Sequence, residues 1–244
     1  MTVNRTLALT FPVLLLTFQL QVRGEVIIDF GNTFSAGANV NQISATQQDL
    51  ADAINTSGVS TGISFSIQNG NGFHPTFTNG NGDPTPGNPA SGIFDSGTTQ
   101  DSLFGHNASF GGTNRPLVEY QISGLNPSNV YTFNMYASRM DASGNRTTDY
   151  AISGINSGAA SLDAAFANNG DSGALATIAS ISPTASGTLS FTIQAGESNN
   201  TAEQFFYIGG LQFYAVPEPS GVAILAILGL PASIRSRHRR ASTR

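Results

Sequence analysis

Apolar and polar residues alternate with a period of two along much of the chain. In the first such segment Val26, Ile28 and Phe30 take alternate positions, which is typical of a β-strand with one face in a core. The same alternation occurs in residues 63–68, 118–122, 131–136, 148–152 and 188–193. A last, mostly apolar strand is predicted over Phe205–Tyr214, with a β-bulge at Gly209-Gly210. Gly, Asn, Pro and Ser separate these segments and predict turns between them.

Only one helix is predicted, over Gln47–Asn55. Thr46 is its expected N-cap, and Leu50, Ala53 and Ile54 would share one face. Parallel α/β folds need several helices of this kind. The pattern therefore predicts an all-β domain over residues 25–215, an antiparallel two-sheet β-sandwich of jelly-roll type with one short helix.

One turn supports the sandwich independently. Residues 124–131, Gly-Leu-Asn-Pro-Ser-Asn-Val-Tyr, resemble the turn of fibronectin-type sandwiches in which a tyrosine hydroxyl bonds back to the backbone before its strand. The resemblance implies that Tyr131 forms such a tyrosine corner. The chain has no Trp and is about twice the length of such a domain, so the likeness supports the architecture and not membership of that family.

Composition narrows the possible functions. The chain of 244 residues has no Cys, which excludes a disulfide framework, a thiolate metal site and a cysteine nucleophile. Its ten basic residues are all Arg, and only Arg115, Arg139 and Arg146 lie between residues 25 and 219, together with all 15 acidic residues. The excess of acidic over basic residues between residues 25 and 219 argues against nucleic-acid binding. The remaining arginines lie at the two ends of the chain, which is typical of targeting segments.

Residues 1–24 have the pattern of a secretory signal peptide. Arg5 precedes the apolar stretch Thr6–Leu20, and Val22 and Gly24 are small or branched residues at positions −3 and −1 before Glu25. We therefore expect export and cleavage by signal peptidase near Glu25. A buried first strand or helix is the alternative interpretation of this segment.

The C-terminal tail, residues 216–244, has three consecutive parts. The first is the motif Val216, Pro217, Glu218, Pro219 and Ser220, the second is the apolar segment 221–234, and the third is a basic cluster with Arg235, Arg237, Arg239 and Arg240. The prolines force an extended backbone around Glu218. The apolar segment has 14 residues, fewer than the roughly 20 of a full helical span, so it would need a thinned bilayer. The arginines would remain on the cytoplasmic side.

This tail resembles the PEP-CTERM sorting domain of bacteria that make exopolysaccharide. In that family a membrane-embedded cysteine protease, the exosortase, is thought to recognise and process the tail. The resemblance implies that Pro217, Glu218 and Pro219 are the recognition motif, that residues 221–234 are the membrane anchor and that residues 235–244 are the stop. A membrane-anchored precursor would then reach the cell surface or extracellular matrix. An ordinary amphipathic terminal helix is the alternative, although residues 221–230 have no polar face.

Enzyme motifs are weak in the middle of the chain. Asp-Ser-Gly occurs at Asp95 and again at Asp171, as in the paired carboxylates of aspartic proteases, but only the first follows a strand-like segment and turn chemistry is the favoured interpretation. His74 and His106 are the only histidines of the domain, and no Gly-x-Ser-x-Gly nucleophile elbow exists. We therefore expect a domain that is not an enzyme, with a secreted hydrolase of matrix polysaccharide as the alternative.

Two binding sites are considered. No cofactor is expected. Calcium is the most reasonable metal for an acidic exported domain, and Asp141, Ser143 and Asn145 alternate in a loop, but turn chemistry is the favoured interpretation of this pattern. The second is a glycan-binding face of Asn134, Tyr136 and Arg139, in which a ring, an amide and a guanidinium would contact a sugar or a matrix exopolysaccharide. Packing of Tyr136 against a second layer is the alternative.

Overall fold

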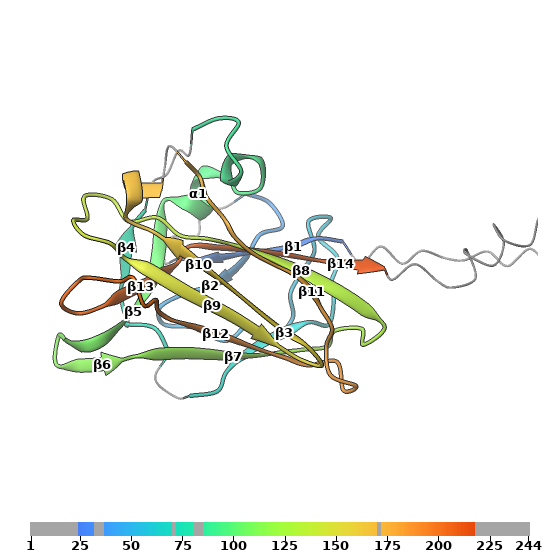
Figure 1. Cartoon of the computed structure of the whole chain (residues 1–244). Helices are drawn as coiled ribbons and strands as arrows, with labels where there is room; N and C mark the ends of the chain where they lie inside the picture. The colour runs from blue at the N-terminus through green and yellow to red at the C-terminus, as the bar shows by residue number, and fades with distance from the viewer. Residues whose placement is uncertain (1–23, 32–36, 70–71, 81–84, 170–171, 218–244) are drawn as a thin grey trace, which may run out of the picture.

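The computed structural model describes residues 24–31, 37–69, 72–80, 85–169 and 172–217, and most of its regular structure is β-strand (Figure 1). One sheet has the order β11 (Ala176–Ile181), β8 (Asn129–Tyr136), β14 (Gly210–Pro217), β1 (Val26–Phe30) and β2 (Asn41–Ile43). A second sheet has the order β10 (Ser157–Asp163), β9 (Thr147–Ser153), β12 (Leu189–Ala195), β7 (Leu117–Ser123) and β3 (Ser64–Ile67). A smaller sheet contains β13 (Phe205–Ile208), β5 (Asp101–Phe110) and β4 (Phe77–Asn79), and β6 (Thr113–Arg115) pairs with β5. The named strand pairs are antiparallel apart from β1 with β2.

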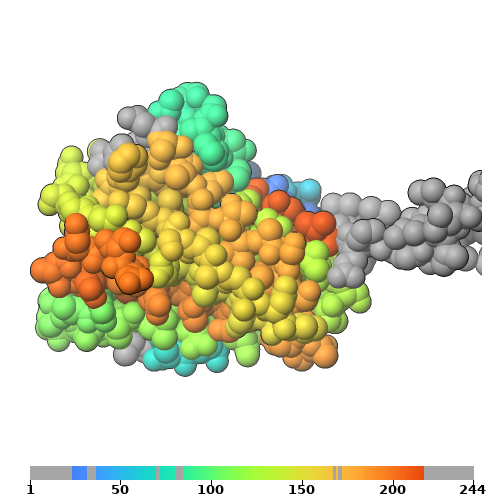
Figure 2. Space-filling view, viewed as in Figure 1, coloured from blue at the N-terminus to red at the C-terminus, as the bar shows by residue number. Residues whose placement is uncertain are grey.

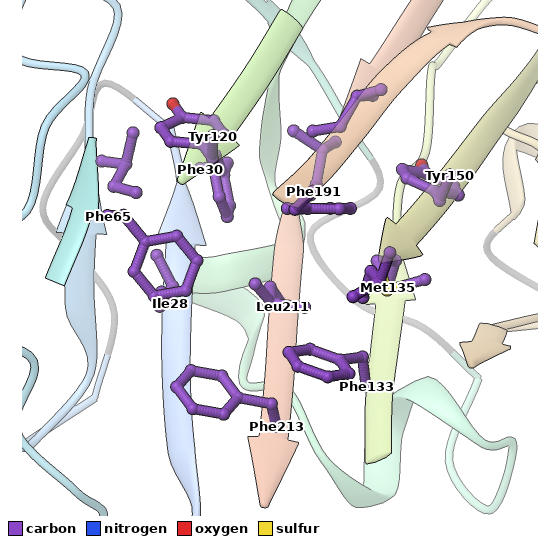
Figure 3. Close-up of a cluster of buried hydrophobic side chains, with 14 of the residues drawn as sticks. Ile28, Phe30, Phe65, Tyr120, Phe133, Met135, Tyr150, Phe191, Leu211 and Phe213 are labelled. Carbon is purple, nitrogen blue, oxygen red and sulfur yellow. The ribbon is translucent and has the colours of Figure 1, made fainter. Parts of the chain in front are cut away.

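The main core lies between the two five-stranded sheets. Figure 3 shows Phe133, Leu211 and Phe213 of the first sheet on the same side as Phe191 and Tyr150 of the second. All five are at most 1% exposed. Burying a large apolar side chain contributes about 1.5–3 kcal/mol, so this layer of rings is the main stabilising feature. The expected β-sandwich is present, with the third sheet as an addition that the alternation did not indicate.

Each segment with period-two alternation forms a strand, namely β1, β3, β7, β8, β9 and β12. The predicted last strand is instead two strands, because the chain changes sheets at Gly209. Before it β13 pairs with β5, and after it β14 pairs with β1 and β8. Gly209 lies at the crossing, where its N–H donates to Tyr136 and its carbonyl accepts from Phe30. The predicted bulge is thus the point that joins the small sheet to the first sheet.

The predicted helix over Gln47–Asn55 is wrong. This segment is extended along β3, with Leu50 and Phe65 exchanging both backbone hydrogen bonds and the N–H of Ala53 bonding to the Ile63 carbonyl. The Asn41 side chain also bonds to the backbone of Ile54. Pairing with a neighbouring strand satisfies the backbone and still buries Ala53, so the weak helical periodicity did not decide the structure.

The single short α-helix of the described residues is α1 (Ser96–Thr99). Asp95 is its N-cap, and its carboxylate accepts hydrogen bonds from the N–H and the hydroxyl of Thr98. Together with the 3₁₀ turn η1 (Ala90–Gly92), this segment covers the outer face of the first sheet, where Ala90, Phe94 and Tyr136 form a second small core. Asp95 therefore has the turn role favoured for its motif.

The predicted tyrosine corner is confirmed. The Tyr131 hydroxyl accepts a hydrogen bond of 2.9 Å from the N–H of Asn126, and Tyr131 is 1% exposed. Leu125 is also buried and bonds to Gly187 through its backbone. This turn therefore ties the β7–β8 connection to the start of β8.

Strand β14 continues through Val216 to Pro217, two residues beyond the expected domain end at 215. At this end β14 pairs only with β8, since its pairing with β1 stops at Phe213. A strand with one open edge tolerates proline, which has no N–H to donate. Most of the predicted signal peptide, Glu218, Pro219, the apolar segment and the basic cluster lie outside the described residues. No helix in the described part of the chain has the length and apolar content to cross a bilayer.

Candidate functional site: an aromatic and arginine pocket

A pocket of about 240 Å³ lies at one end of the molecule. Its lining, called here the aromatic–arginine pocket, consists of Thr78, Phe104, Phe110, Arg139, Arg146, Phe205 and Tyr207. The strands that form it, β4, β5 and β13, gather at the left of Figure 1, whereas β14 ends at the right. Figure 2 shows the segments near residues 110, 140 and 200 lying next to one another at this end.

Alternation along β5 and β13 builds the floor of the pocket. Phe104 pairs with Tyr207 in the register of the two strands, so both side chains point to the same face. The next pair is Gly105 with Phe206, which points to the core. A Cβ atom on Gly105 would lie 2.1 Å from the ring of Phe206. Because Gly105 has no side chain, the Phe206 ring can pack directly against the backbone of β5. The neighbouring residues Phe104 and Tyr207 line the pocket.

Arg146 is held over the pocket by aromatic rings. Its guanidinium carbon lies 5.2 Å from the centre of the Phe205 ring and 5.9 Å from that of Tyr207, both within cation–π distance. Its Nη1 also donates to the Tyr207 hydroxyl. These contacts fix the guanidinium position. One Nη1 N–H is used by Tyr207 and Nε is buried, so the other Nη donors are the ones that a ligand would meet.

Arg139 also lines the pocket and acts on the same hydroxyl. Its Nη1 donates to the carbonyl of Met140, and its charge acts on Tyr207. Burial raises the pKa of the Tyr207 phenol, and Arg146 and Arg139 act in the opposite direction. The two guanidinium groups therefore converge on one hydroxyl at the base of the pocket.

A histidine and a phenylalanine extend the aromatic surface beyond the pocket. His74 stacks on Phe104 with ring centres 4.7 Å apart, and Phe110, which is 39% exposed, lies edge-on to Phe205 at 5.0 Å. Burial lowers the pKa of His74, and His106 and Arg115 lower it further. His74 is therefore neutral at pH 7 and offers an aromatic face.

The pocket concentrates the positive charge of the domain. Arg139 and Arg146 line it, and Arg115 lies beside it because β6 pairs Arg115 with His106. Among the described residues, the contacts of the two lining guanidinium groups are to a carbonyl, a hydroxyl and rings. All three arginines of an otherwise acidic domain thus gather at one end, far apart in sequence but close in space. Rings together with guanidinium groups whose contacts here include no carboxylate suit a ligand with an apolar face and an anionic group.

The three residues of the expected glycan face do not form one surface. Asn134 lies on the outer face of the first sheet, where its amide donates to Gln212 at 2.5 Å and accepts from Thr177 at 2.8 Å. Tyr136 is fully buried and its hydroxyl donates to the carbonyl of Asn169. Its ring packs against Phe94 at 6.0 Å, the second-layer packing considered as the alternative. Only Arg139 lies in the pocket.

The sequence missed the pocket because two of its rings, Phe104 and Phe110, come from β5, which shows no clean alternation. Residues 101–110 read Asp-Ser-Leu-Phe-Gly-His-Asn-Ala-Ser-Phe, with apolar residues on both faces. The composition did contain one indication of the site, since Arg115, Arg139 and Arg146 are the only arginines between residues 25 and 219. Their convergence needed the tertiary structure.

The expected calcium loop has the geometry of a turn. Asn145 accepts two hydrogen bonds from Thr147 through its side-chain oxygen, and Asp141 has a positive φ of 54°. Asn145 is thus already engaged within its own loop. Among the described residues, no three His, Asp or Glu side chains are grouped so that they could hold a metal ion together. Asp171, the second Asp-Ser-Gly aspartate, lies outside the described residues.

A second depression of about 320 Å³ lies on the second sheet. Its lining is mostly polar, with Glu119, Gln121 and Ser190 among the residues. The only ring in the lining is that of Tyr120, which is fully buried. This depression therefore offers hydrogen-bonding groups without an exposed aromatic face, and the aromatic–arginine pocket is the stronger candidate.

Comparison with known proteins gives distant likenesses in structure alone. No protein-family model matches the chain, and no curated protein sequence matches it. The extracellular domain of ANXUR1 from Arabidopsis thaliana superimposes with a TM-score of 0.45 at 11% identity, over 80% of this chain and 48% of that one. The ANXUR2 extracellular domain gives 0.37 at 10% identity, over 80% and 42%. TmCBM61, solved in complex with β-1,4-galactotriose, gives 0.30 at 11% identity, over 64% and 88%. The chain thus spans less than half of the two ANXUR domains.

Proposed function

We propose that this protein is an exported, non-enzymatic glycan-binding protein of the cell surface or extracellular matrix. Its aromatic–arginine pocket would take a sugar unit that bears a carboxylate. The observation that carries this proposal is the convergence of Arg139 and Arg146 over the rings of Phe205 and Tyr207. A matrix exopolysaccharide with acidic sugars has the matching chemistry.

The two kinds of lining residue would divide the recognition between them. A sugar ring has an apolar face of C–H groups that can lie on an aromatic ring, and Phe110 and Phe205 provide rings that reach solvent. A guanidinium binds a carboxylate with two parallel hydrogen bonds. Because ring contacts already hold Arg146 in place, it would lose little conformational entropy on binding.

The hydrolase alternative requires a pair of carboxylates on either side of the glycosidic bond, about 5–9.5 Å apart. The residues that line the aromatic–arginine pocket include no carboxylate. The lining of this pocket therefore favours binding over hydrolysis. Incubation of the protein with acidic oligosaccharides, followed by analysis of the products, tests this point, and new reducing ends would support the hydrolase instead.

Binding is tested with the purified full-length chain in detergent. Isothermal titration with a uronic-acid oligosaccharide and with a neutral oligosaccharide of the same length should give affinity for the acidic one only. Arg146→Gln should weaken binding at least tenfold, since hydrogen bonds to charged groups contribute about 1.5–3 kcal/mol. Arg115→Gln is the matched control, because it also removes one positive charge but at a residue beside the pocket. It should weaken binding less than Arg146→Gln does. Equal affinity for the two sugars, or equal loss in both variants, would contradict the proposal.

Sorting is the second part of the proposed function. The sequence of residues 1–24 supports cleavage by signal peptidase. The sequence of the tail supports recognition of Pro217, Glu218 and Pro219 by an exosortase-type protease, with residues 221–234 as a transient membrane anchor. The strands that line the pocket, β4, β5 and β13, lie at the opposite end of the domain from the end of β14 (Figure 1). A domain attached through β14 would therefore direct its pocket away from the membrane.

The sorting proposal is tested in a host that has an exosortase. Glu218→Ala should leave a larger, membrane-held precursor, whereas Glu197→Ala, a change of an exposed carboxylate within the domain, should be processed normally. Replacing Arg235, Arg237, Arg239 and Arg240 should impair retention by removing the cytoplasmic stop. Fractionation of the cells and measurement of protein size give the result. Equal size and location of wild type and Glu218→Ala would refute the sorting function.

A further inference from the structure

Asp29 is a buried carboxylate without a hydrogen-bond partner. It is 0% exposed, and neither of its side-chain oxygens accepts a hydrogen bond in the structure. Asp29 is on β1, between Gln42 of β2 and Gly210 of β14 in the register of the first sheet. Its side chain points to the outer face, away from the core residues Ile28 and Phe30, because neighbours on a strand face opposite ways. A buried, unpaired carboxylate is costly, so this residue calls for a physical explanation.

Two further carboxylates lie close to Asp29. Burial and, after it, the negative charges of Asp101 and Asp95 raise the pKa of Asp29 to about 8, and the side chain of Gln42 acts in the opposite direction. Asp95 is engaged with the backbone of Gly37 and with Thr98. Asp101, at the start of β5, is 3% exposed. No basic side chain is among the groups that act on Asp29.

The backbone is shaped to accommodate these carboxylates. A Cβ atom on Gly31 would lie 2.0 Å from one side-chain oxygen of Asp101 and 3.0 Å from the other. Gly31, two residues after Asp29, therefore gives the Asp101 carboxylate space against β1. The arginines of the domain are occupied elsewhere, around the aromatic–arginine pocket. The negative charge of Asp29 must therefore be balanced by a bound proton or by a bound cation.

We propose that Asp29 and Asp101 are ligands of a calcium ion that is bound between β1, β5 and α1. Calcium takes six to eight oxygen ligands from carboxylates, amide and backbone carbonyls, and water. Asp29 supplies two oxygens that accept no hydrogen bond, and Asp101 supplies the second carboxylate. Backbone carbonyls and water would complete the set of ligands. Asp95 adds negative charge from the α1 N-cap. Two carboxylates suffice for a weak site, which matches the dissociation constants of about 10⁻⁴–10⁻³ M that extracellular calcium modules have.

The site lies apart from the aromatic–arginine pocket, since the lining of that pocket includes none of these residues. Its role is to hold β1, β5 and the α1 segment together. Calcium would therefore stabilise the fold. Without calcium, Asp29 must take up a proton for the chain to fold at neutral pH, because its pKa in the folded chain is raised to about 8. The proposal is independent of the sugar-binding function.

The test is thermal unfolding of the full-length chain, first stripped with EGTA and then measured with 10 mM CaCl₂ or with NaCl at equal ionic strength. Calcium at 10 mM is about 10 to 100 times a dissociation constant of 10⁻³ to 10⁻⁴ M, which raises Tm by about 3–10 °C for a domain of this size. We expect this rise with CaCl₂ and not with NaCl. Equilibrium dialysis with ⁴⁵Ca on the wild type should give one ion per chain and needs no variant.

Asp29→Asn keeps the shape of the side chain and removes its charge. It should have a higher Tm than the wild type in EGTA and lose the response to CaCl₂. Glu197→Gln removes an exposed charge and should respond as the wild type does. Absence of ⁴⁵Ca binding, a Tm rise equal to that in NaCl, or an unchanged calcium response in Asp29→Asn would overturn the proposal.

Discussion

Gly105→Ala tests whether the Phe206 ring is closely packed against Gly105 of strand β5, whose next residue on one side, Phe104, lines the pocket. Gly105 is buried opposite Phe206, and a Cβ atom there would meet three ring carbons of Phe206 at 2.1, 2.6 and 2.7 Å. Ordinary van der Waals contact begins at about 3.4 Å, so the ring must retreat by roughly 1.3 Å. Phe206 is 0% exposed, and densely packed interiors do not offer such space without moving other side chains.

The expected cost follows from overpacking. Inserting a methyl group into a packed core costs typically 1–3 kcal/mol, and alanine recovers part of this because glycine in a strand is entropically unfavourable by about 0.5–1 kcal/mol. We expect a net loss of about 1–2 kcal/mol in the free energy of unfolding. For a domain of this length this corresponds to a Tm lower by about 2–8 °C.

Urea unfolding followed by tyrosine fluorescence measures this loss. Gly92→Ala is the matched control, because Gly92 is exposed and a Cβ atom added there would have nothing within 4 Å. The control should stay within about 0.5 kcal/mol of the wild type. If Gly105→Ala is as stable as the wild type, or if both variants lose the same amount, then close packing of Phe206 on Gly105 is not a feature of the protein.

Two further predictions concern the tyrosine corner and the aromatic surface. Tyr131→Phe should lower the free energy of unfolding by about 1–2 kcal/mol in urea, because it leaves the N–H of Asn126 without its partner; an unchanged value would mean that the corner is not stabilising. Burial lowers the pKa of His74, so the unfolded chain takes up a proton at higher pH than the folded chain and stability falls as the pH drops below about 6.5. His74→Gln should therefore lose less stability than the wild type between pH 7 and 5, measured by thermal unfolding, and an identical pH profile would contradict this.

Local pattern was sufficient for most of the secondary structure of this chain. Alternation predicted β1, β3, β7, β8, β9 and β12 correctly, because a half-buried strand needs a period of two whatever lies around it. The Gly-Leu-x-Pro turn before Tyr131 was equally readable, since its hydrogen bond joins residues only five apart. These features depend on neighbours in sequence.

The fate of individual residues depended on what packs against them. The segment Gln47–Asn55 had the spacing of a helix, yet β3 offered its backbone a better set of partners. Tyr136 had the position of an exposed residue, yet η1 and α1 cover that face of the sheet. Alternation indicates that a residue faces outward from its strand, but not whether a later segment covers it.

Both candidate sites belong to the tertiary structure. The pocket combines rings from β5 and β13 with arginines from the loops next to β8 and β9, and the carboxylate pair joins residues 72 positions apart in the chain, Asp29 and Asp101. The sequence established that the domain has three arginines against many acids, which limits where charge can be balanced. The packing of strands that are distant in sequence decided that the arginines lie over aromatic rings. It also decided that Asp29 and Asp101 lie near each other, with no basic side chain among the groups that act on Asp29. Sheet order, and not sequence separation, sets which side chains of different strands come into contact.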